Sequence, residues 1–499
     1  MKRILSMFLL LTLLCTLGMT QAFAEAEETT LIVAQSVDAS TMDPQKQGGM
    51  SSMNVLINMF DTLVFRDSEG NLIPGLATEW EALDDLTWQF KLREGVTFHN
   101  GYPFTAEDVK FSLERLINPD TGSPIVELAA LDHVDIVDDY TVNLVFKTPD
   151  PIVPNKLVMF GGVIISKQYT EEHDADYLAT NPVGTGPFKF VSWTKDSQVV
   201  MEAYEDHWRG APAYDNLIFR VVPNQADMLA ALQTGEINMT NSIPYDLAVS
   251  VQGDPNISIA SQKSIRVQFV NIDTAVEPLN DKRVRQALNY AVDKQAIIEA
   301  ILGGHATQIP TLIPQENFGY VDTLEPYGYD PEKAKSLLAE AGYPDGFTVT
   351  FDALNTELTV IQAIVGYLEA VGVKVEMNVV DSSTLTSRCA AKEAANLYFQ
   401  NNTGWTMDGM SNYQSYARTD RRYSRGGSEE LNALVDIEET TIDPEVRMDA
   451  FEQAEALMYD EAYFIYLWQM DNLYATTADV EYTPNKIGLL WMFDAKPVE

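Results

Sequence analysis

The sequence predicts an α/β protein of two lobes, with mixed sheets flanked by helices and a cleft between the lobes. Helical patterns that end at a glycine and lead directly into alternating strand patterns recur along the chain, which is typical of α/β layering. The chain has 499 residues, enough to bury more than one hydrophobic core. Because no Pro/Gly/Ser-rich linker separates two halves, we expect the lobes to exchange strands and to meet at a hinge.

The first clear elements are a strand followed by a helix. Apolar and polar side chains alternate over residues 87–98, which predicts a half-buried strand that ends in a turn. Thr105 and Asp108 have the spacing of a capping box, so a helix is expected to begin there. The apolar residues that follow keep helical spacing until Pro119 ends the pattern.

Four more helices are predicted towards the C-terminus, each carrying apolar residues at helical spacing. They are expected to begin at Asp281, Asp330, about Thr359 and Asp443. The first of them is expected to continue without a break to the glycine pair 303–304. Alternating and aromatic patterns then predict strands that directly follow the third and fourth helices, over 373–379 and 464–468.

The charge of the chain excludes one large class of partner. There are 33 basic and 73 acidic side chains, which give a formal net charge of −40. Such a surface repels a phosphate backbone, so no nucleic-acid partner is expected. The aromatic content of 10% also argues against an acidic disordered chain, because such chains have little to pack into a core.

The N-terminus has the layout of a secretory signal peptide. Two basic residues precede an apolar run over 4–17, and a small-x-small pattern ends at Ala24. The run is shorter than the roughly 20 residues needed to span a bilayer, so we expect export and cleavage after Ala24. Cys15 lies inside the apolar run, which argues against lipidation. The mature chain, which would be soluble, keeps only Cys389 and can form no internal disulfide.

The motifs of enzymes and metal proteins are missing from the sequence. The five histidines have no metal-ligand spacing, no GxSxG sequence is present, and the glycines around Pro187 lack the spacing of a phosphate loop. Adjacent acidic pairs at 84–85, 138–139 and 171–172 fit a solvated acidic surface better than a glycosidase pair. We therefore expect no catalytic residues, no metal and no cofactor.

A set of motifs in a fixed order resembles the family-5 extracellular solute-binding proteins of ABC importers, of the dipeptide and oligopeptide type. They are PGLATEW at 74–80, TWQFKLREGVTFHNG at 87–101, PVGTGPF at 182–188, LQTGEI at 232–237 and RVRQAL at 283–288. The resemblance extends from residue 31 to about residue 475.

The resemblance implies the periplasmic-binding-protein fold of type II, in its large form with an extra N-terminal subdomain. After the signal peptide expected over 1–24, it implies lobe I over 25–265 plus 475–499, with the extra subdomain at about 60–190. It further implies lobe II over 266–474 and hinge crossings near 266–273 and 464–474.

The same resemblance implies a ligand site. Gly404, Trp405 and Asp408 match a loop of the second lobe in which the Trp is a pocket wall and the Asp binds the α-ammonium of a peptide. A carboxylate in a closing cleft makes charge-assisted hydrogen bonds worth about 1.5 to 3 kcal/mol with an ammonium. From spacing alone, Asp408 could equally be an ordinary loop acid.

A second segment matches the first-lobe loop near the ligand. Gly49, Met50 and Ser51 lie in it, where glycine would let the backbone approach a peptide and Met50 would form an adaptable wall. A surface loop is an equal alternative.

Two departures from the family pattern concern the ligand. Asn355–Leu358 lack the arginine that commonly binds the α-carboxylate of a dipeptide, and Met410–Tyr413 replace an Asp-Pro pair. Both favour a longer peptide or another amine-bearing solute over a strict dipeptide. Four arginines over 418–425 could receive an anionic group, although their polar surroundings favour a solvated loop.

The sequence thus predicts an exported, periplasmic protein, not an enzyme, that captures a peptide-like solute and delivers it to the transmembrane subunits of an ABC permease. A monomer is expected. Two alternatives stay open: the same fold binding an oligosaccharide, a metal chelate or an opine, and a secreted acid/base hydrolase.

Overall fold

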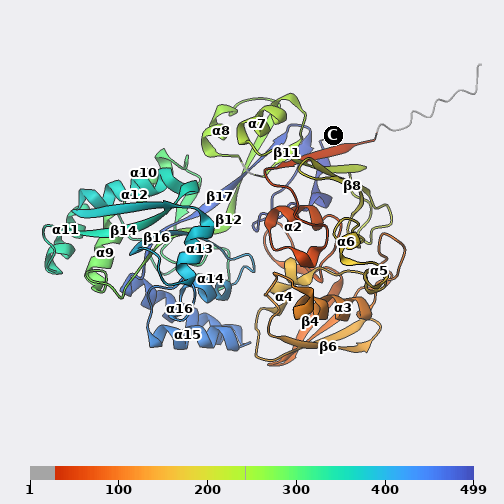
Figure 1. The fold of residues 1–499 in the computed structure, drawn as a ribbon, viewed down its shortest axis with the longest axis horizontal. Helices are drawn as coiled ribbons and strands as arrows, with labels where there is room; N and C mark the ends of the chain where they lie inside the picture. The colour runs from red at the N-terminus through yellow and green to blue at the C-terminus, as the bar shows by residue number, and fades with distance from the viewer. Residues whose placement is uncertain (1–27, 242, 499) are drawn as a thin grey trace, which may run out of the picture.

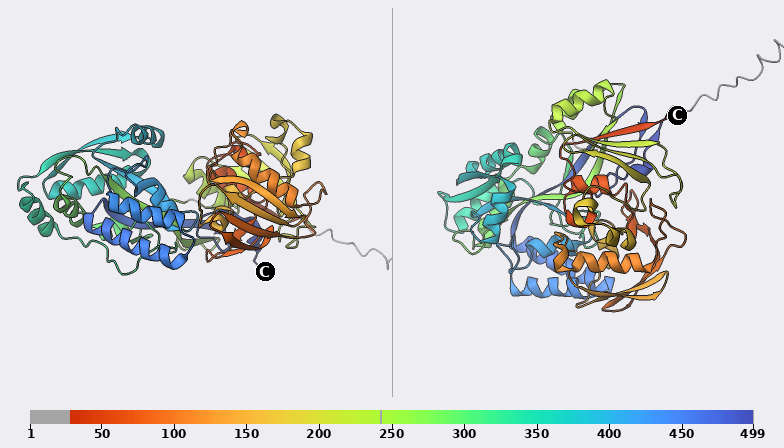
Figure 2. Two further views of the ribbon diagram at one scale, coloured as in Figure 1. Left: turned by 90° about the horizontal axis from the view of Figure 1, so that it is seen from below. Right: turned by 45° about the vertical axis from the view of Figure 1, so that its right-hand side comes forward.

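The computed structural model describes residues 28–241 and 243–498, and it shows two lobes joined by a pair of long strands (Figure 1). The pair consists of β12 (Ile257–Ile272) and β17 (Phe464–Thr477), which run antiparallel through the middle of the molecule. Seen from below, the two bodies lie side by side (Figure 2). The predicted two-lobed α/β fold is confirmed. The predicted signal peptide lies outside the described residues.

One eleven-stranded sheet continues from lobe to lobe. Its order is β15-β14-β16-β12-β17-β11-β1-β10-β9-β8, and β13 pairs with β17 off this path. The bounds of its other strands are β1 Thr30–Gln35, β8 Phe188–Thr194, β9 Gln198–Ala203, β10 Asn216–Val221, β11 Met239–Thr240, β13 Ala306–Gln308, β14 Phe347–Leu354, β15 Val373–Val380 and β16 Leu397–Thr403. Because β12 and β17 contribute to both halves of this sheet, the lobes exchange strands as predicted.

Each half of the sheet contains parallel strands. In lobe II, β14 is parallel to both β15 and β16. In lobe I, β1 is parallel to β10 and β11. Parallel strands are covered by helices on their faces, and their apolar side chains are buried accordingly, as Phe351 and Leu31 are here.

A second, four-stranded sheet lies in lobe I. Its order is β4 (Ala77–Asp84), β5 (Thr87–Leu92), β7 (Thr141–Phe146) and β6 (Leu131–Asp138). The helix α3 (Ala106–Ile117) packs against it, and the predicted capping box is present at its start.

The predicted long helix after Asp281 is wrong in one respect, because it is two helices. α9 (Lys282–Ala291) ends at Val292, whose backbone is extended, and α10 (Lys294–Ala300) begins anew. The carboxylate of Asp293 accepts a hydrogen bond from the N–H of Ala296 at 3.0 Å, which satisfies a free donor of the new helix.

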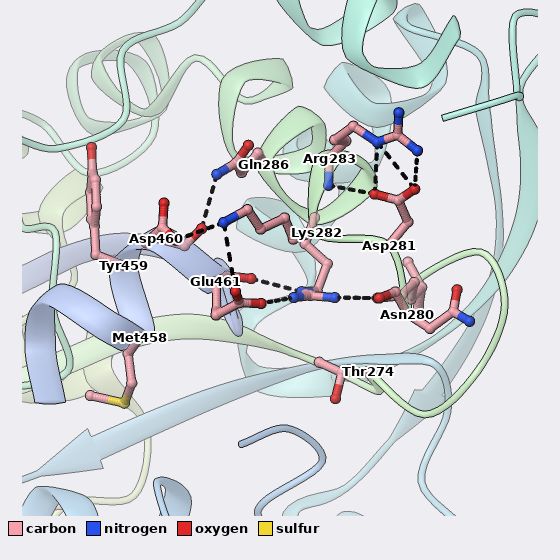
Figure 3. Close-up of polar contacts among 12 residues, drawn as sticks. Thr274, Asn280, Asp281, Lys282, Arg283, Gln286, Met458, Tyr459, Asp460 and Glu461 are labelled. Atoms are coloured by element: carbon pink, nitrogen blue, oxygen red, sulfur yellow. Dashed lines mark hydrogen bonds and ion pairs between the residues drawn. The ribbon is translucent and has the colours of Figure 1, made fainter. Parts of the chain in front are cut away.

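Three other predicted helices are present: α11 (Pro331–Glu340), α12 (Leu358–Ala370) and α16 (Pro444–Glu461). The start of α9 is bound to the end of α16 by ion pairs (Figure 3). There, Lys282 Nζ lies 2.6 Å from Asp460 Oδ2, and Arg285 binds Glu461 at 2.9 Å. Acidic groups at a helix C-terminus are unfavourable alone, and these cations compensate for them.

The other α-helices and strands complete the two lobes. The helices are α2 Met50–Leu56, α4 Val153–Lys156, α5 Lys167–Glu172, α6 Ala175–Leu178, α7 Gln225–Thr234, α8 Tyr245–Ser250, α13 Ser382–Ala390, α14 Gly409–Tyr416 and α15 Glu429–Thr440. The strands are β2 Val64–Arg66, β3 Leu72–Pro74, β18 Val480–Glu481 and β19 Lys496–Pro497. Within the described part of the chain, no helix is both long and apolar enough to cross a membrane.

Candidate functional site

The carboxyl ends of the parallel strands in lobe II identify a candidate site. In open α/β sheets, ligands bind just outside these ends. β14 ends at Leu354 and β16 ends at Thr403, and the two strands are parallel neighbours. The segments that follow them, 355–357 and 404–408, therefore share one edge of the sheet.

The loop Gly404–Asp408 is fixed by close packing at its first residue. A Cβ at Gly404 would lie 2.4 Å from Asn412 Oδ1 and 2.5 Å from Asn317 Nδ2, so only glycine fits without displacing them. Asn317 Nδ2 donates a hydrogen bond to the Gly404 carbonyl at 3.1 Å. Met407 has a φ of 55°, a left-handed conformation that turns the chain sharply towards Asp408.

The same loop contacts lobe I. The ring of Trp405 meets the ring of Phe160 edge to face, with centroids 6.0 Å apart. The carbonyl of Thr406 accepts a hydrogen bond from Asn155 Nδ2 at 2.8 Å and another from the Arg66 guanidinium. The predicted wall residue, Trp405, thus lies where the two lobes meet.

The carboxylate of Asp408 is buried and already paired. It is 3% exposed, and it binds both terminal nitrogens of Arg447 at 2.6 and 3.0 Å. Its Oδ1 also accepts the backbone N–H of Met410 at 3.0 Å, which caps α14. A carboxylate offers about four acceptor positions, so one is left for a further donor.

Two more buried carboxyl groups lie around Arg447, and the sequence patterns did not indicate them. Glu438 is 0% exposed, and neither of its carboxyl oxygens has a partner among the described residues. Burial raises the pKa of Glu438 well above its usual value, with Glu455 adding to the effect. Burial also raises the pKa of Glu455 to about 8, although Tyr413 donates a hydrogen bond to it. Burial therefore favours the protonated form of both carboxyl groups.

At the neighbouring strand end, Glu357 occupies the segment where dipeptide binders commonly have an arginine. Burial raises the pKa of its carboxyl group, an effect that Arg266 and hydrogen bonds with Gln268 and Asn401 oppose. The Nε atom of Arg266 is buried without a partner in the described structure. This corner of the site therefore combines an acidic group with a cation.

The predicted first-lobe residues lie at the start of α2. Gly49 precedes the helix, and its N–H donates to Gln47 Oε1 at 2.9 Å. The side chain of Met50 is 38% exposed and Ser51 is half-buried. No hydrogen bond or ring contact joins these residues to 404–408 in the described structure, although α2 lies on the side of lobe I turned towards lobe II (Figure 1).

Arg66, which donates a hydrogen bond to the Thr406 carbonyl, also lines a cavity of lobe I. Its empty volume is about 480 Å³, part of it open to solvent, and Phe65, Tyr482 and Trp491 contribute aromatic walls. The indole N–H of Trp491 is buried without a partner among the described residues. Burial lowers the pKa of Arg66 to about 10, against the influence of Asp408.

Three of the four arginines over 418–425, namely Arg418, Arg421 and Arg425, contact acidic side chains. Arg418 contacts Asp420 at 3.1 Å, and Arg421 contacts Glu439 at 3.3 Å.

Within the described residues, no group of three or more His, Cys, Asp or Glu side chains could hold a metal ion. Cys389 is buried, and burial raises the pKa of its thiol to about 11.

The fold and this site define a two-lobed binding protein for small solutes. The family model "Bacterial extracellular solute-binding proteins, family 5 Middle" matches residues 71–424. The chain therefore belongs to family 5 of these proteins, which serve ABC importers, as the sequence motifs predicted.

Relatives in this family differ in what they bind. The Glutathione-binding protein GsiB of Pectobacterium atrosepticum is 32% identical over 385 residues, which are 75% of this chain and 74% of that protein. A Helicobacter pylori ABC transporter-associated periplasmic binding protein in complex with the peptide STSA superposes with a TM-score of 0.78. It is 26% identical, and 94% of this chain and 98% of that chain are covered. The protein AgaA of A. tumefaciens in complex with agropinic acid has a TM-score of 0.76 at 26% identity, covering 94% and 99% of the two chains.

Proposed function

We propose that this protein captures a peptide-like solute between its lobes, closes around it and delivers it unchanged to the permease of an ABC importer. The observation that carries the proposal is the position of the loop 404–408. It lies at the carboxyl edge of the lobe II sheet, where α/β proteins bind ligands, and it also contacts Phe160, Asn155 and Arg66 of lobe I. A solute at this loop would touch both lobes and favour closure.

In this proposal, Asp408 binds an ammonium group of the solute through its remaining acceptor position. The solute would lie beside the loop 404–408, whose course is fixed by the packing of Asn317 and Asn412 against Gly404. Trp405 and Phe160 form an apolar wall beside the charged group, where exclusion of water strengthens the hydrogen bond. Gly49, Met50 and Ser51 would contact the solute from lobe I.

The far end of the solute would meet an acidic rather than a cationic side chain from the β14 end. Glu357 lies there, and Arg266 is a cation that acts on its carboxyl group. A strict dipeptide would bring its α-carboxylate close to Glu357, which is unfavourable between like charges. We therefore favour a longer peptide, or another amine-bearing solute, over a dipeptide.

Closure requires a hinge, and the joining strands offer one. The β12–β17 ladder loses its regular register between Lys263 and Val267 and again between Gln268 and Phe269. Irregular pairing of this kind bends a strand locally. We place the hinge crossings near 266–273 and 464–474, with lobe I over 25–265 plus 475–499 and lobe II between them.

The remaining parts of the proposal concern location and partners. Export through the predicted signal peptide, with cleavage after Ala24 and no lipidation, would place the protein in the periplasm. It would act there as a monomer without enzymatic activity, and its macromolecular partners would be the transmembrane subunits of the permease.

Calorimetry with a panel of solutes tests the proposal. The panel contains peptides of two to five residues, the same peptides with an acetylated N-terminus, and agropinic acid. We expect binding of the free-amine peptides of three to five residues, and a solute at about 100 times its Kd should add about 2.7 kcal/mol of stability. X-ray scattering should show a more compact shape with the solute. Cleavage of a panel member, or an unchanged shape with every binder, would contradict the proposal.

A non-peptide solute is the second candidate. It is favoured by the pairing of Asp408 with Arg447, which cancels the charge that would attract an ammonium, and by the structural likeness to a protein that binds agropinic acid. Binding of agropinic acid but of no peptide would support this candidate.

A further inference from the structure

The acidic groups behind the candidate site form a cluster whose charges are balanced. Asp408 and Arg447 bind each other at 2.6 Å, and both are at least 95% buried. Beside them, Glu438 on α15 is fully buried, and neither of its carboxyl oxygens has a partner in the described structure. An unpartnered buried carboxyl group of this kind is uncommon and calls for an explanation.

The position of Arg447 connects the two acidic residues. Its Nε donates a hydrogen bond to the backbone carbonyl of Glu438 at 3.0 Å, while its two terminal nitrogens bind Asp408. The guanidinium therefore already lies against residue 438. A guanidinium has five N–H donors in a rigid fork, and it can bind a carboxylate through two of them at once.

Binding of an ammonium group at Asp408 would disturb this balance. The carboxylate would then have two cations competing for it, and Arg447 would lose part of its compensation in a buried position. A buried charge without a partner is strongly destabilising. The cluster can accept one more positive charge only if another group in it becomes negative.

We propose that Glu438 is the second counter-ion of Arg447: when an ammonium group of the solute binds Asp408, the guanidinium turns to the Glu438 carboxyl group, which releases its proton. The O–H bond of that carboxyl group breaks, the proton passes to the solvent, and the cluster with its bound ammonium stays neutral. Glu438 is thus a positioning residue that frees Asp408 for the solute. This inference rests on the proposed binding of an amine-bearing solute.

The surroundings of Glu438 support its neutral state before binding. The titratable groups that face it are Glu455 and Arg447 from α16, Asp408 from the loop and Glu439 from its own helix, and Tyr413 of α14 lies near it as well. Burial and these acidic neighbours raise its pKa, against the influence of Arg447. A guanidinium that turned fully towards it would reverse that balance and favour ionisation.

Calorimetry in two buffers with different ionisation enthalpies tests this inference on the full-length mature protein. The probe is a free-amine tripeptide that binds the parent. At neutral pH we expect release of about one proton per bound peptide, and no release in Glu438→Gln. The substitution should weaken binding of this peptide about tenfold or more, because Arg447 loses its charged alternative partner. Glu455→Gln, a matched change of a neighbouring buried acid, should still release the proton.

The outcomes separate the two proposals. Binding by the parent without proton release overturns the role of Glu438 and leaves the proposed function intact, and this measurement needs no variant. Proton release that persists in Glu438→Gln also overturns it. If neither this peptide nor any other amine-bearing solute binds the parent, the proposed function fails and the inference fails with it.

Discussion

The stability of lobe II should depend on pH through Glu455. This side chain is 1% exposed and accepts a hydrogen bond from the Tyr413 hydroxyl. Burial raises its pKa from 4.5 to about 8. Between these two values the carboxyl group is ionised in the unfolded chain and protonated in the folded one. The unfolded state then binds fewer protons, so the stabilisation is present below pH 4.5 and is lost as the pH rises towards 8.

The size of the effect follows from the linkage relation. One proton of difference changes the free energy of unfolding by about 1.4 kcal/mol per pH unit. Between about pH 5.5 and about pH 7.5, Glu455 should therefore lower the stability by about 2 to 3 kcal/mol. Glu455→Gln keeps the shape and the oxygen that accepts the Tyr413 hydrogen bond, and it cannot ionise. The variant should gain about 2 to 3 kcal/mol relative to the parent over this interval.

Denaturant unfolding at the two pH values measures this difference. Glu452→Gln is the matched control, because Glu452 lies on the same helix and is exposed. The control should follow the parent at both pH values. If the parent and Glu455→Gln lose stability in parallel as the pH rises, the buried protonated state assigned to Glu455 is wrong.

Two other substitutions test the packing at Gly404 and the buried ion pair between Lys156 and Asp150. Gly404→Ala would place a methyl group within 2.5 Å of side-chain atoms of Asn317 and Asn412, and should cost about 1 to 3 kcal/mol. The melting temperature and the affinity for the solute should both fall. A variant with the melting temperature and affinity of the parent would contradict the packing argument. Lys156→Met leaves the carboxylate of Asp150, 3% exposed, without its buried cation, and should cost about 3 to 5 kcal/mol in denaturant unfolding. A loss below about 1 kcal/mol would show that this pair contributes as little as a surface ion pair.

Local sequence patterns predicted those elements whose signals lie within a few residues. The capping box at Thr105 and the helix starts at Asp330 and Asp443 are present in the structure. The break between α9 and α10 was missed, because the apolar spacing continues through it and only the cap at Asp293 marks the new helix. An Asp inside an apolar helical pattern was the available signal.

The candidate site could be predicted only in part, for a physical reason. The motif around Trp405 and Asp408 is local, so neighbouring residues alone were enough to propose it as a ligand loop. The partner of Asp408 is Arg447, 39 residues away, and the lobe I partner of Thr406 is Arg66, 340 residues away. Such pairs follow from how the sheet and helices pack, so a pattern of neighbouring residues contains no signal for them.

Two hydrogen bonds join the loop 404–408 to lobe I. The carbonyl of Thr406 accepts donors from both Asn155 and Arg66, and these two hydrogen bonds must break when the lobes separate at this loop. A hydrogen bond contributes about 0.5 to 1.5 kcal/mol net, and one to a charged donor about 1.5 to 3. Together they favour closure by about 2 to 4.5 kcal/mol before the cost of ordering both lobes is subtracted. A solute that adds one charge-assisted bond at Asp408 contributes a similar amount, so its arrival or departure can decide whether the lobes stay together.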